Sequence, residues 1–289
     1  MGLDVNGVKL LLHAHCSGID FSSSAMIGRQ SLHLSCREFQ AVLSQFGFKV
    51  EQALVKGWLE KKGAYAEDFL NMLGAKTIHS FDYSNYENAS CIHDMNLAIA
   101  NEYKGRYSVV IDSGSLEHVF NFPVAIRNCM EMVREGGYFL CMTPANNFMG
   151  HGFYQFSPEL FFSVFSADNG FEVDKVVVVE SRRGARWYQA KNPREVRRRI
   201  TLTNSMPTYM LVIAKKLATV EIFKNPPMQS DYVTEWSGAA GARSKWSGSA
   251  FARYVYKPTE RRLKKFVRLF FSGLNPRFYK PIDPRRSRD

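Results

Sequence analysis

The sequence is poor in cysteine and has no long apolar run. Five of its 289 residues are cysteine, and no two of them form a C-x-x-C pair. Because disulfide frameworks and zinc sites need such paired thiols, we expect neither, and we interpret the cysteines as buried apolar side chains in a reducing compartment. No stretch approaches the ~20 apolar residues of a membrane-spanning helix. The N-terminal segment has no basic leader before its apolar run, so we predict no secretory signal and a cytoplasmic location.

Positive charge is concentrated near the C-terminus. Residues 1–215 contain 22 Lys and Arg against 21 Asp and Glu, whereas residues 216–289 contain 16 against 6, within a net charge of +11. Such asymmetry is typical of a tail that binds an anionic membrane, a nucleic acid or an acidic partner. In residues 259–271 apolar side chains recur at helical spacing between basic ones, which predicts an amphipathic helix on an anionic membrane surface. Docking on the protein's own domain is the alternative, and no module accompanies the tail that would favour nucleic acid.

Strand-like and helix-like segments alternate between residues 24 and 215. Apolar residues at positions 39, 42, 43 and 46 have helical spacing, and residues 107–111 form an apolar run typical of a strand covered on both faces. Their alternation predicts an α/β fold with a mostly parallel sheet. The last strand, 208–214, follows strand 171–180 without a clear helix, so we expect it to be antiparallel. The predicted divisions are an N-terminal extension (1–23), an α/β domain (24–216) and a basic C-terminal extension with a linker and the amphipathic helix (217–289).

Aspartate follows three of the predicted strands, as Asp82, Asp94 and Asp112. In open parallel sheets ligands bind beyond the carboxyl ends of the strands, where strand order reverses. An ionised carboxylate accepts several hydrogen bonds, so Asp82 would bind ribose hydroxyls and Asp94 the amine of adenine. For any single aspartate, helix capping is the favoured explanation. Three aspartates at the corresponding ends of consecutive strands favour a nucleoside-binding pocket.

A resemblance to a known family covers the second half of this domain most strongly. The segments YSVVIDSGSLEHV (107–119), NCMEMVREGGYFL (128–140) and TPAN (143–146) resemble the class I S-adenosylmethionine-dependent methyltransferases. The resemblance implies a Rossmann-like, mostly parallel seven-stranded sheet with an antiparallel last strand, and S-adenosylmethionine as cofactor. The positions that correspond to cofactor-binding residues are Gly28, Arg29, Asp82, Tyr83, Asp94, Met95, Asp112 and Ser113.

The glycine-rich loop of that family is reduced here to one glycine, Gly28. The side chains of Arg29 and Gln30 would occupy space that the family leaves open for the cofactor. Alternatively, the Arg29 guanidinium would bind the cofactor carboxylate. The segment 47–64 is a second departure, which we expect to form part of a lid.

Two histidines, His118 and His151, follow strands at the edge where an acceptor would lie. Imidazole titrates near neutral pH and can deprotonate a hydroxyl, so both are candidate catalytic residues. A loop-capping hydrogen bond is the alternative for His118. His13 and His15 would share one face of a strand, but without further ligands nearby we predict no metal site.

These observations favour methyl transfer, with O-methylation of a small-molecule, glycan or lipid-linked acceptor and peripheral attachment to the inner face of a membrane. The alternative is a non-catalytic interaction module of the same fold that has lost the cofactor. A third interpretation, an RNA methyltransferase, would show affinity that falls steeply with salt.

Overall fold

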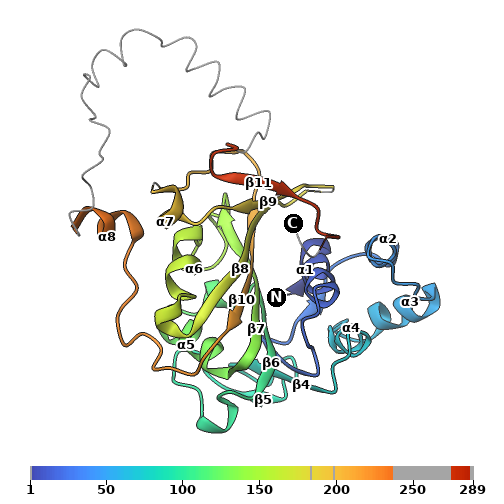
Figure 1. Ribbon diagram of the computed structural model, residues 1–289. Helices are drawn as coiled ribbons and strands as arrows, with labels where there is room; N and C mark the ends of the chain where they lie inside the picture. The colour runs from blue at the N-terminus through green and yellow to red at the C-terminus, as the bar shows by residue number, and fades with distance from the viewer. Residues whose placement is uncertain (1, 183, 198, 237–274, 287–289) are drawn as a thin grey trace, which may run out of the picture.

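The computed structural model describes residues 2–182, 184–197, 199–236 and 275–286. One mixed sheet crosses the molecule, with helices on both of its faces (Figure 1). The strands are β1 (Gly2–Leu3), β2 (Ser23–Ile27), β3 (Ser31–Leu32), β4 (Thr77–Asp82), β5 (Cys91–Ile92), β6 (Tyr107–Ser113), β7 (Val133–Asn146), β8 (Phe171–Glu180), β9 (Trp187–Ala190), β10 (Thr208–Lys216) and β11 (Tyr279–Ile282). The helices are α1 (Val5–Cys16), α2 (Cys36–Gln45), α3 (Gln52–Glu60), α4 (Glu67–Met72), α5 (Phe122–Met132), α6 (Pro158–Val164), α7 (Pro193–Val196) and α8 (Ser230–Trp236).

The main sheet has nine strands in the order β11-β9-β8-β10-β7-β6-β2-β4-β5. The strands β5, β4, β2, β6 and β7 run parallel, and β10 is antiparallel to both of its neighbours, β7 and β8. The mostly parallel α/β fold and the antiparallel strand at 208–214 are therefore confirmed. The predicted count of seven strands is wrong, because β9 and β11 add two antiparallel strands at the edge beyond β8.

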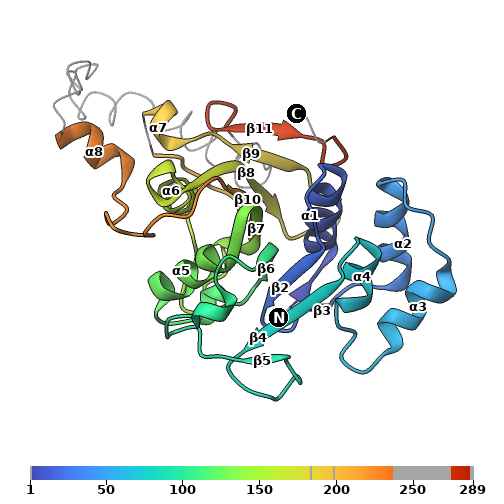
Figure 2. The same ribbon diagram turned by 60° about the horizontal axis from the view of Figure 1, so that its bottom comes forward.

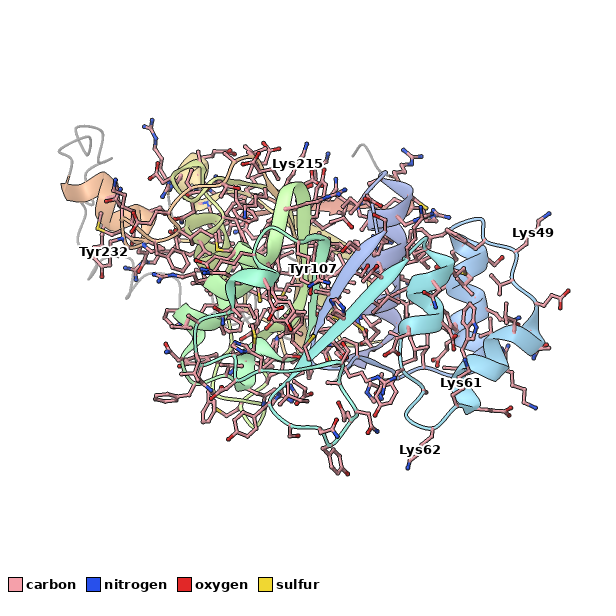
Figure 3. All side chains as sticks on the ribbon, turned by 90° about the horizontal axis from the view of Figure 1, so that it is seen from below. Lys49, Lys61, Lys62, Tyr107, Lys215 and Tyr232 are labelled. Atoms are coloured by element: carbon pink, nitrogen blue, oxygen red, sulfur yellow. The ribbon has the colours of Figure 1, made fainter. Side chains whose placement is uncertain are left out.

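Strand β6 lies at the centre of the core, and all seven of its residues are buried. Alternate side chains of a strand point to opposite faces. Accordingly Val109 and Ile111 join the cluster under α1–α4, whereas Val110 joins the cluster under α5 and α6. Tyr107 joins the same cluster as Val110, because the pairing of β6 with β7 is irregular between Tyr107 and Val109. Figure 2 shows these two helical layers on opposite sides of the sheet. In Figure 3 Tyr107 lies among the strands, while Lys49, Lys61 and Lys62 point outward from the α2–α3 layer.

The first residues of the chain contribute to the core. The Asp4 carboxylate accepts hydrogen bonds from the backbone N–H groups of Asn6 and Gly7 and so caps α1, and Leu11 is fully buried. His13 and His15 lie on this helix. The interpretation of this segment as a strand is therefore wrong, because the Asp4 cap and the apolar spacing of residues 8, 11 and 12 favour a helix.

The segment 47–64 belongs to the helical layer. It contains α3, whose Val55 and Trp58 side chains are buried, and the Trp58 ring packs 5.8 Å from that of Phe39 in α2. The part of the segment that carries Val55 and Trp58 is therefore packed into the core.

The described part of the C-terminal extension returns to the sheet. Strand β11 pairs antiparallel with β9, and Phe278 and Tyr279 are buried in the core. The amphipathic helix predicted at 259–271 and much of the predicted linker lie outside the described residues. No described helix is both long enough and apolar enough to cross a bilayer.

Candidate functional site

A cleft of about 220 Å³ opens at the carboxyl ends of β2, β4 and β5. Strand order reverses here, since β4 and β5 lie on one side of β2 and β6 and β7 on the other. This switch point is where open α/β sheets bind ligands. The cleft is lined by Ile27, Gly28, Phe81, Asp82, Tyr83, His93, Asp94, Met95, Asn96, Ser115, His118 and Val119.

Most of the predicted cofactor residues meet in this cleft. Gly28, Asp82, Tyr83, Asp94 and Met95 line it together. These residues come from three separate segments, and the parallel pairing of β2, β4 and β5 brings them to one edge. Asp82 and Asp94 thus face a shared cavity, as a nucleoside pocket requires. Arg29, Asp112 and Ser113 do not line it.

Gly28 makes the turn that follows β2. Its φ is +71°, and its N–H donates a hydrogen bond of 2.7 Å to the carbonyl of Phe81. Residues with a Cβ rarely adopt this left-handed conformation, so the single glycine of the loop stands where the backbone needs it. The buried Gln30 side chain donates to the Ile27 carbonyl and to the Ser115 hydroxyl. It lies beneath the loop and does not fill the cleft.

The Arg29 guanidinium points to a different set of partners. Its Nε donates to Oε1 of Glu67 at 2.7 Å, and its Nη1 donates to the carbonyls of Glu87 and Asn88. The guanidinium also stacks 3.9 Å above the ring of Tyr65. The side chain therefore fastens neighbouring segments together and leaves the cleft open.

Asp94 is held in an ionised state by its own loop. Its Oδ1 accepts hydrogen bonds from the backbone and side-chain N–H groups of Asn96, and these bonds lower the pKa of the carboxyl. The buried Asn128 of α5 accepts from the Ile99 N–H at 2.9 Å and donates to the Leu97 carbonyl at 2.7 Å. Sequence reasoning missed Asn128, since only the fold brings α5 against this loop.

Asp112 and Ser113 are enclosed by protein. Asp112 accepts hydrogen bonds from the N–H groups of Ser115 and Leu116 and from the Cys141 thiol. Burial, together with the nearby Glu117, raises its pKa to about 8. The Ser113 hydroxyl donates to the Gly2 carbonyl. Both side chains are buried and do not line the cleft.

The two candidate catalytic histidines lie against each other at one end of the cleft. The ring centroids of His118 and His151 are 4.9 Å apart in an edge-on arrangement. His118 lines the cleft, and burial followed by the nearby His151 lowers its pKa. Glu117, which the sequence marked only as a neighbour, lies close to both imidazoles. Its Oε1 is 3.4 Å from Nε2 of His151.

Exposed apolar side chains surround these histidines. Phe120, Met149 and Phe153 are 72%, 92% and 66% exposed, although large apolar side chains are usually buried. The rings of Phe120 and Phe153 contact edge-on at 5.7 Å. The loops that carry His118 and His151 therefore also carry exposed apolar side chains, which do not line the cleft.

No protein-family model and no curated protein matches this sequence. Among solved structures, a Bacillus halodurans protein provisionally described as a methyltransferase is 8% identical, with a TM-score of 0.40, covering 73% of this chain and 99% of its own. A Listeria monocytogenes protein provisionally described as an S-adenosylmethionine-dependent methyltransferase is 14% identical, with a TM-score of 0.36 and the same coverage. The Thermus thermophilus branched-chain polyamine synthase, solved with N4-aminopropylspermidine and 5'-methylthioadenosine, is 10% identical, with a TM-score of 0.36, covering 74% of this chain and 56% of its own.

Likenesses this low carry no argument about what this chain binds. The strand order, with β10 antiparallel between β7 and β8, is that of an α/β fold with a mixed sheet. These strands have the directions that the sequence resemblance implies.

Proposed function

We propose that this protein is an S-adenosylmethionine-dependent methyltransferase. The observation that carries the proposal is the meeting of Asp82 and Asp94 in one cleft with Gly28, at the switch point of the sheet. The volume of about 220 Å³ would hold the adenosine part of the cofactor, with its methionine part outside this cleft. Asp82 would accept from the ribose hydroxyls and Asp94 from the adenine amine, with the buried Met95 contacting the base.

Bound there, the cofactor supplies an electrophilic methyl group on its sulfonium. The protein's own part is to align an acceptor with that methyl and to receive a proton where the acceptor carries one. His118 lines the cleft, and its lowered pKa keeps the imidazole neutral and able to accept a proton. His151 lies beside it on the solvent side.

We propose a hydroxyl of a small molecule, glycan or lipid-linked precursor as the acceptor. The exposed Phe120, Met149 and Phe153 favour an acceptor with an apolar portion beside the reacting oxygen. The basic charge of residues 216–289 supports an acceptor at an anionic membrane surface. Nucleic acid is a less favoured partner, because no described element offers a nucleic-acid-binding module.

Calorimetric titration with S-adenosylhomocysteine tests the cofactor assignment. We expect saturable binding that weakens at least about tenfold in Asp82→Asn and in Asp94→Asn, which is roughly 1.4 kcal/mol. The matched control is Asp20→Asn, which removes one exposed carboxylate that pairs with Arg134 before β2, away from the cleft. Absence of binding at millimolar ligand would favour the alternative, an interaction module of this fold without a cofactor.

Vesicle sedimentation tests the membrane part. Deleting residues 216–289 would also remove β11 and Lys216, whose buried Nζ donates to the carbonyls of Met130 and Val133. Reversing the charges of Arg261, Arg262, Lys264 and Lys265 leaves these contacts intact. We expect wild-type protein to sediment with anionic vesicles and the charge-reversed variant to stay in the supernatant; equal sedimentation would reject the membrane role.

A further inference from the structure

Three side chains suited to metal binding meet beside the cleft. Glu117 and His118 belong to the 3₁₀ turn Leu116–His118 that follows β6, and His151 belongs to the loop that follows β7. Each offers one ligand atom, and these atoms all lie within 4.8 Å of one another.

The Glu117 carboxylate lacks the partners that a buried charge needs. Its side chain is 1% exposed, and the nearest side-chain donor to its Oε1 among the described residues is Nε2 of His151, 3.4 Å away and without good hydrogen-bond geometry. Its Oε2 receives only a long hydrogen bond, 3.4 Å, from the Thr143 hydroxyl. Leaving a buried carboxylate so poorly compensated costs several kcal/mol unless a positive charge is near.

The surrounding residues supply little positive charge. Among the described residues the ion-pair partner of Glu117 is an imidazole, His151, and no lysine or arginine side chain pairs with it. Burial raises the pKa of Glu117, and a second buried acid, Asp112, lies close by with a raised pKa of its own. A divalent cation at Oε1 would take the place of the proton that burial favours on this carboxyl.

The backbone holds the two loops in contact. The N–H of Phe153 donates to the Glu117 carbonyl at 2.8 Å. Gly152 has a φ of +68°, and a Cβ on it would lie 2.8 Å from that carbonyl oxygen. Only glycine permits this approach, which keeps His151 beside Glu117. The cluster is therefore built by the fold rather than by chance contact of mobile side chains.

We propose that Glu117, His118 and His151 bind one divalent transition-metal cation, of which Zn²⁺ and Mn²⁺ are the practical probes. Two imidazoles with one carboxylate are a known ligand set for such cations. Three protein ligands leave coordination positions open, as at catalytic rather than structural sites. Both imidazoles are exposed, and His118 also lines the cleft, so the open positions face the side from which an acceptor enters.

The identity of the further ligand rests on the proposed function. If the acceptor carries a hydroxyl, its oxygen would occupy an open position of the cation, and the cation would fix that oxygen next to the cleft and lower the pKa of the hydroxyl. With the cation bound, His118 would act as a ligand and not as the proton acceptor of the metal-free site. The metal site itself rests only on the three side chains and their surroundings.

The first test is calorimetric titration of metal-stripped protein with Zn²⁺. The second is titration with Mn²⁺, in which binding is measured as the loss of the electron paramagnetic resonance signal of free Mn²⁺. We expect one cation per chain. Glu117→Gln keeps the shape and removes the charge, and His151→Ala removes an exposed ligand. Each variant should weaken binding by more than the roughly tenfold that loss of an outer-shell partner costs. The matched control is His15→Ala on α1, whose ring packs against Phe21 and Phe48 away from the cluster.

Absence of stoichiometric binding to folded wild-type protein would overturn the proposal, and so would affinities that Glu117→Gln and His151→Ala leave unchanged. Thermal melting checks that each variant is folded. Titration of the protein with S-adenosylhomocysteine in the presence of a metal chelator separates the two proposals. If the protein binds the cation but not S-adenosylhomocysteine, the metal site is retained and the methyltransferase proposal is rejected. If it binds S-adenosylhomocysteine but not the cation, only the metal site is rejected.

Discussion

Arg29 and Glu67 form an ion pair, with Nε 2.7 Å from Oε1, that joins the loop after β2 to α4. The two side chains are only 24% and 29% exposed, so water screens the pair less than it would on an open surface. The sequence resemblance suggested the cofactor carboxylate as the partner of this guanidinium.

Arg29→Ala should therefore lower stability rather than cofactor affinity. We expect a loss of about 1–2 kcal/mol in urea unfolding, because a charged hydrogen bond and two bonds to carbonyls disappear. Affinity for S-adenosylhomocysteine should change less than about twofold, well under the 1.4 kcal/mol that a tenfold change represents. The control, Arg134→Ala, breaks an ion pair whose side chains are both 48% exposed and should cost little. A large loss of affinity with unchanged stability would instead place Arg29 on the cofactor.

Asn128→Ala should disturb the loop that carries Asp94. The substitution leaves the Ile99 N–H and the Leu97 carbonyl without their partner, at a cost of roughly 2–3 kcal/mol. Because that loop also positions Met95, we expect weaker binding of S-adenosylhomocysteine, measured where the variant is still folded.

A second buried asparagine provides the matched control. Asn169 donates to the Val164 carbonyl and accepts from the Phe223 N–H, on residues that do not line the cleft. Asn169→Ala should destabilise the protein to a similar extent while leaving affinity unchanged. Equal losses of affinity in both variants would mean that Asn128 acts through general stability alone.

Asp112 should make stability depend on pH. Its pKa is about 8 in the folded protein, against about 3.9 in an unfolded chain. Between these values the folded state holds a proton that the unfolded state has released, so stability falls as pH rises through this window. Asp112→Asn removes this term.

Urea unfolding at about pH 5 and about pH 8 measures the effect. We expect the stability of Asp112→Asn relative to wild type to rise between the two conditions. Parallel pH profiles for the two proteins would show that Asp112 is ionised in the folded state.

Local pattern predicted the elements that bury a regular face. The apolar run 107–111 became β6, strand 171–180 became β8, and the segment around Phe39 became α2. Asp82 and Asp94 could be placed at one edge because parallel strands align their carboxyl ends. These inferences need only periodicity and strand direction.

What the sequence did not reveal depends on contacts between distant segments. The preference of Arg29 for Glu67 follows from the position of α4, which no local pattern encodes. Glu117 acquires its neighbour His151 only because the loop after β7 folds onto the turn after β6. The pairing of β11 with β9 joins residues far apart in the chain, and neither short segment has a strong strand pattern of its own.

The return of the chain through β11 also anchors its far end. Ile282 packs with the core cluster that includes α1, and the Pro284 carbonyl lies 2.6 Å from Nδ1 of His13. Residues 237–274 thus begin and finish on the same folded body. A protease that cuts once within this segment would divide the chain into two pieces. The C-terminal piece should stay bound through β11, so the cleaved protein should elute from a gel-filtration column at the position of the intact protein until a denaturant is added.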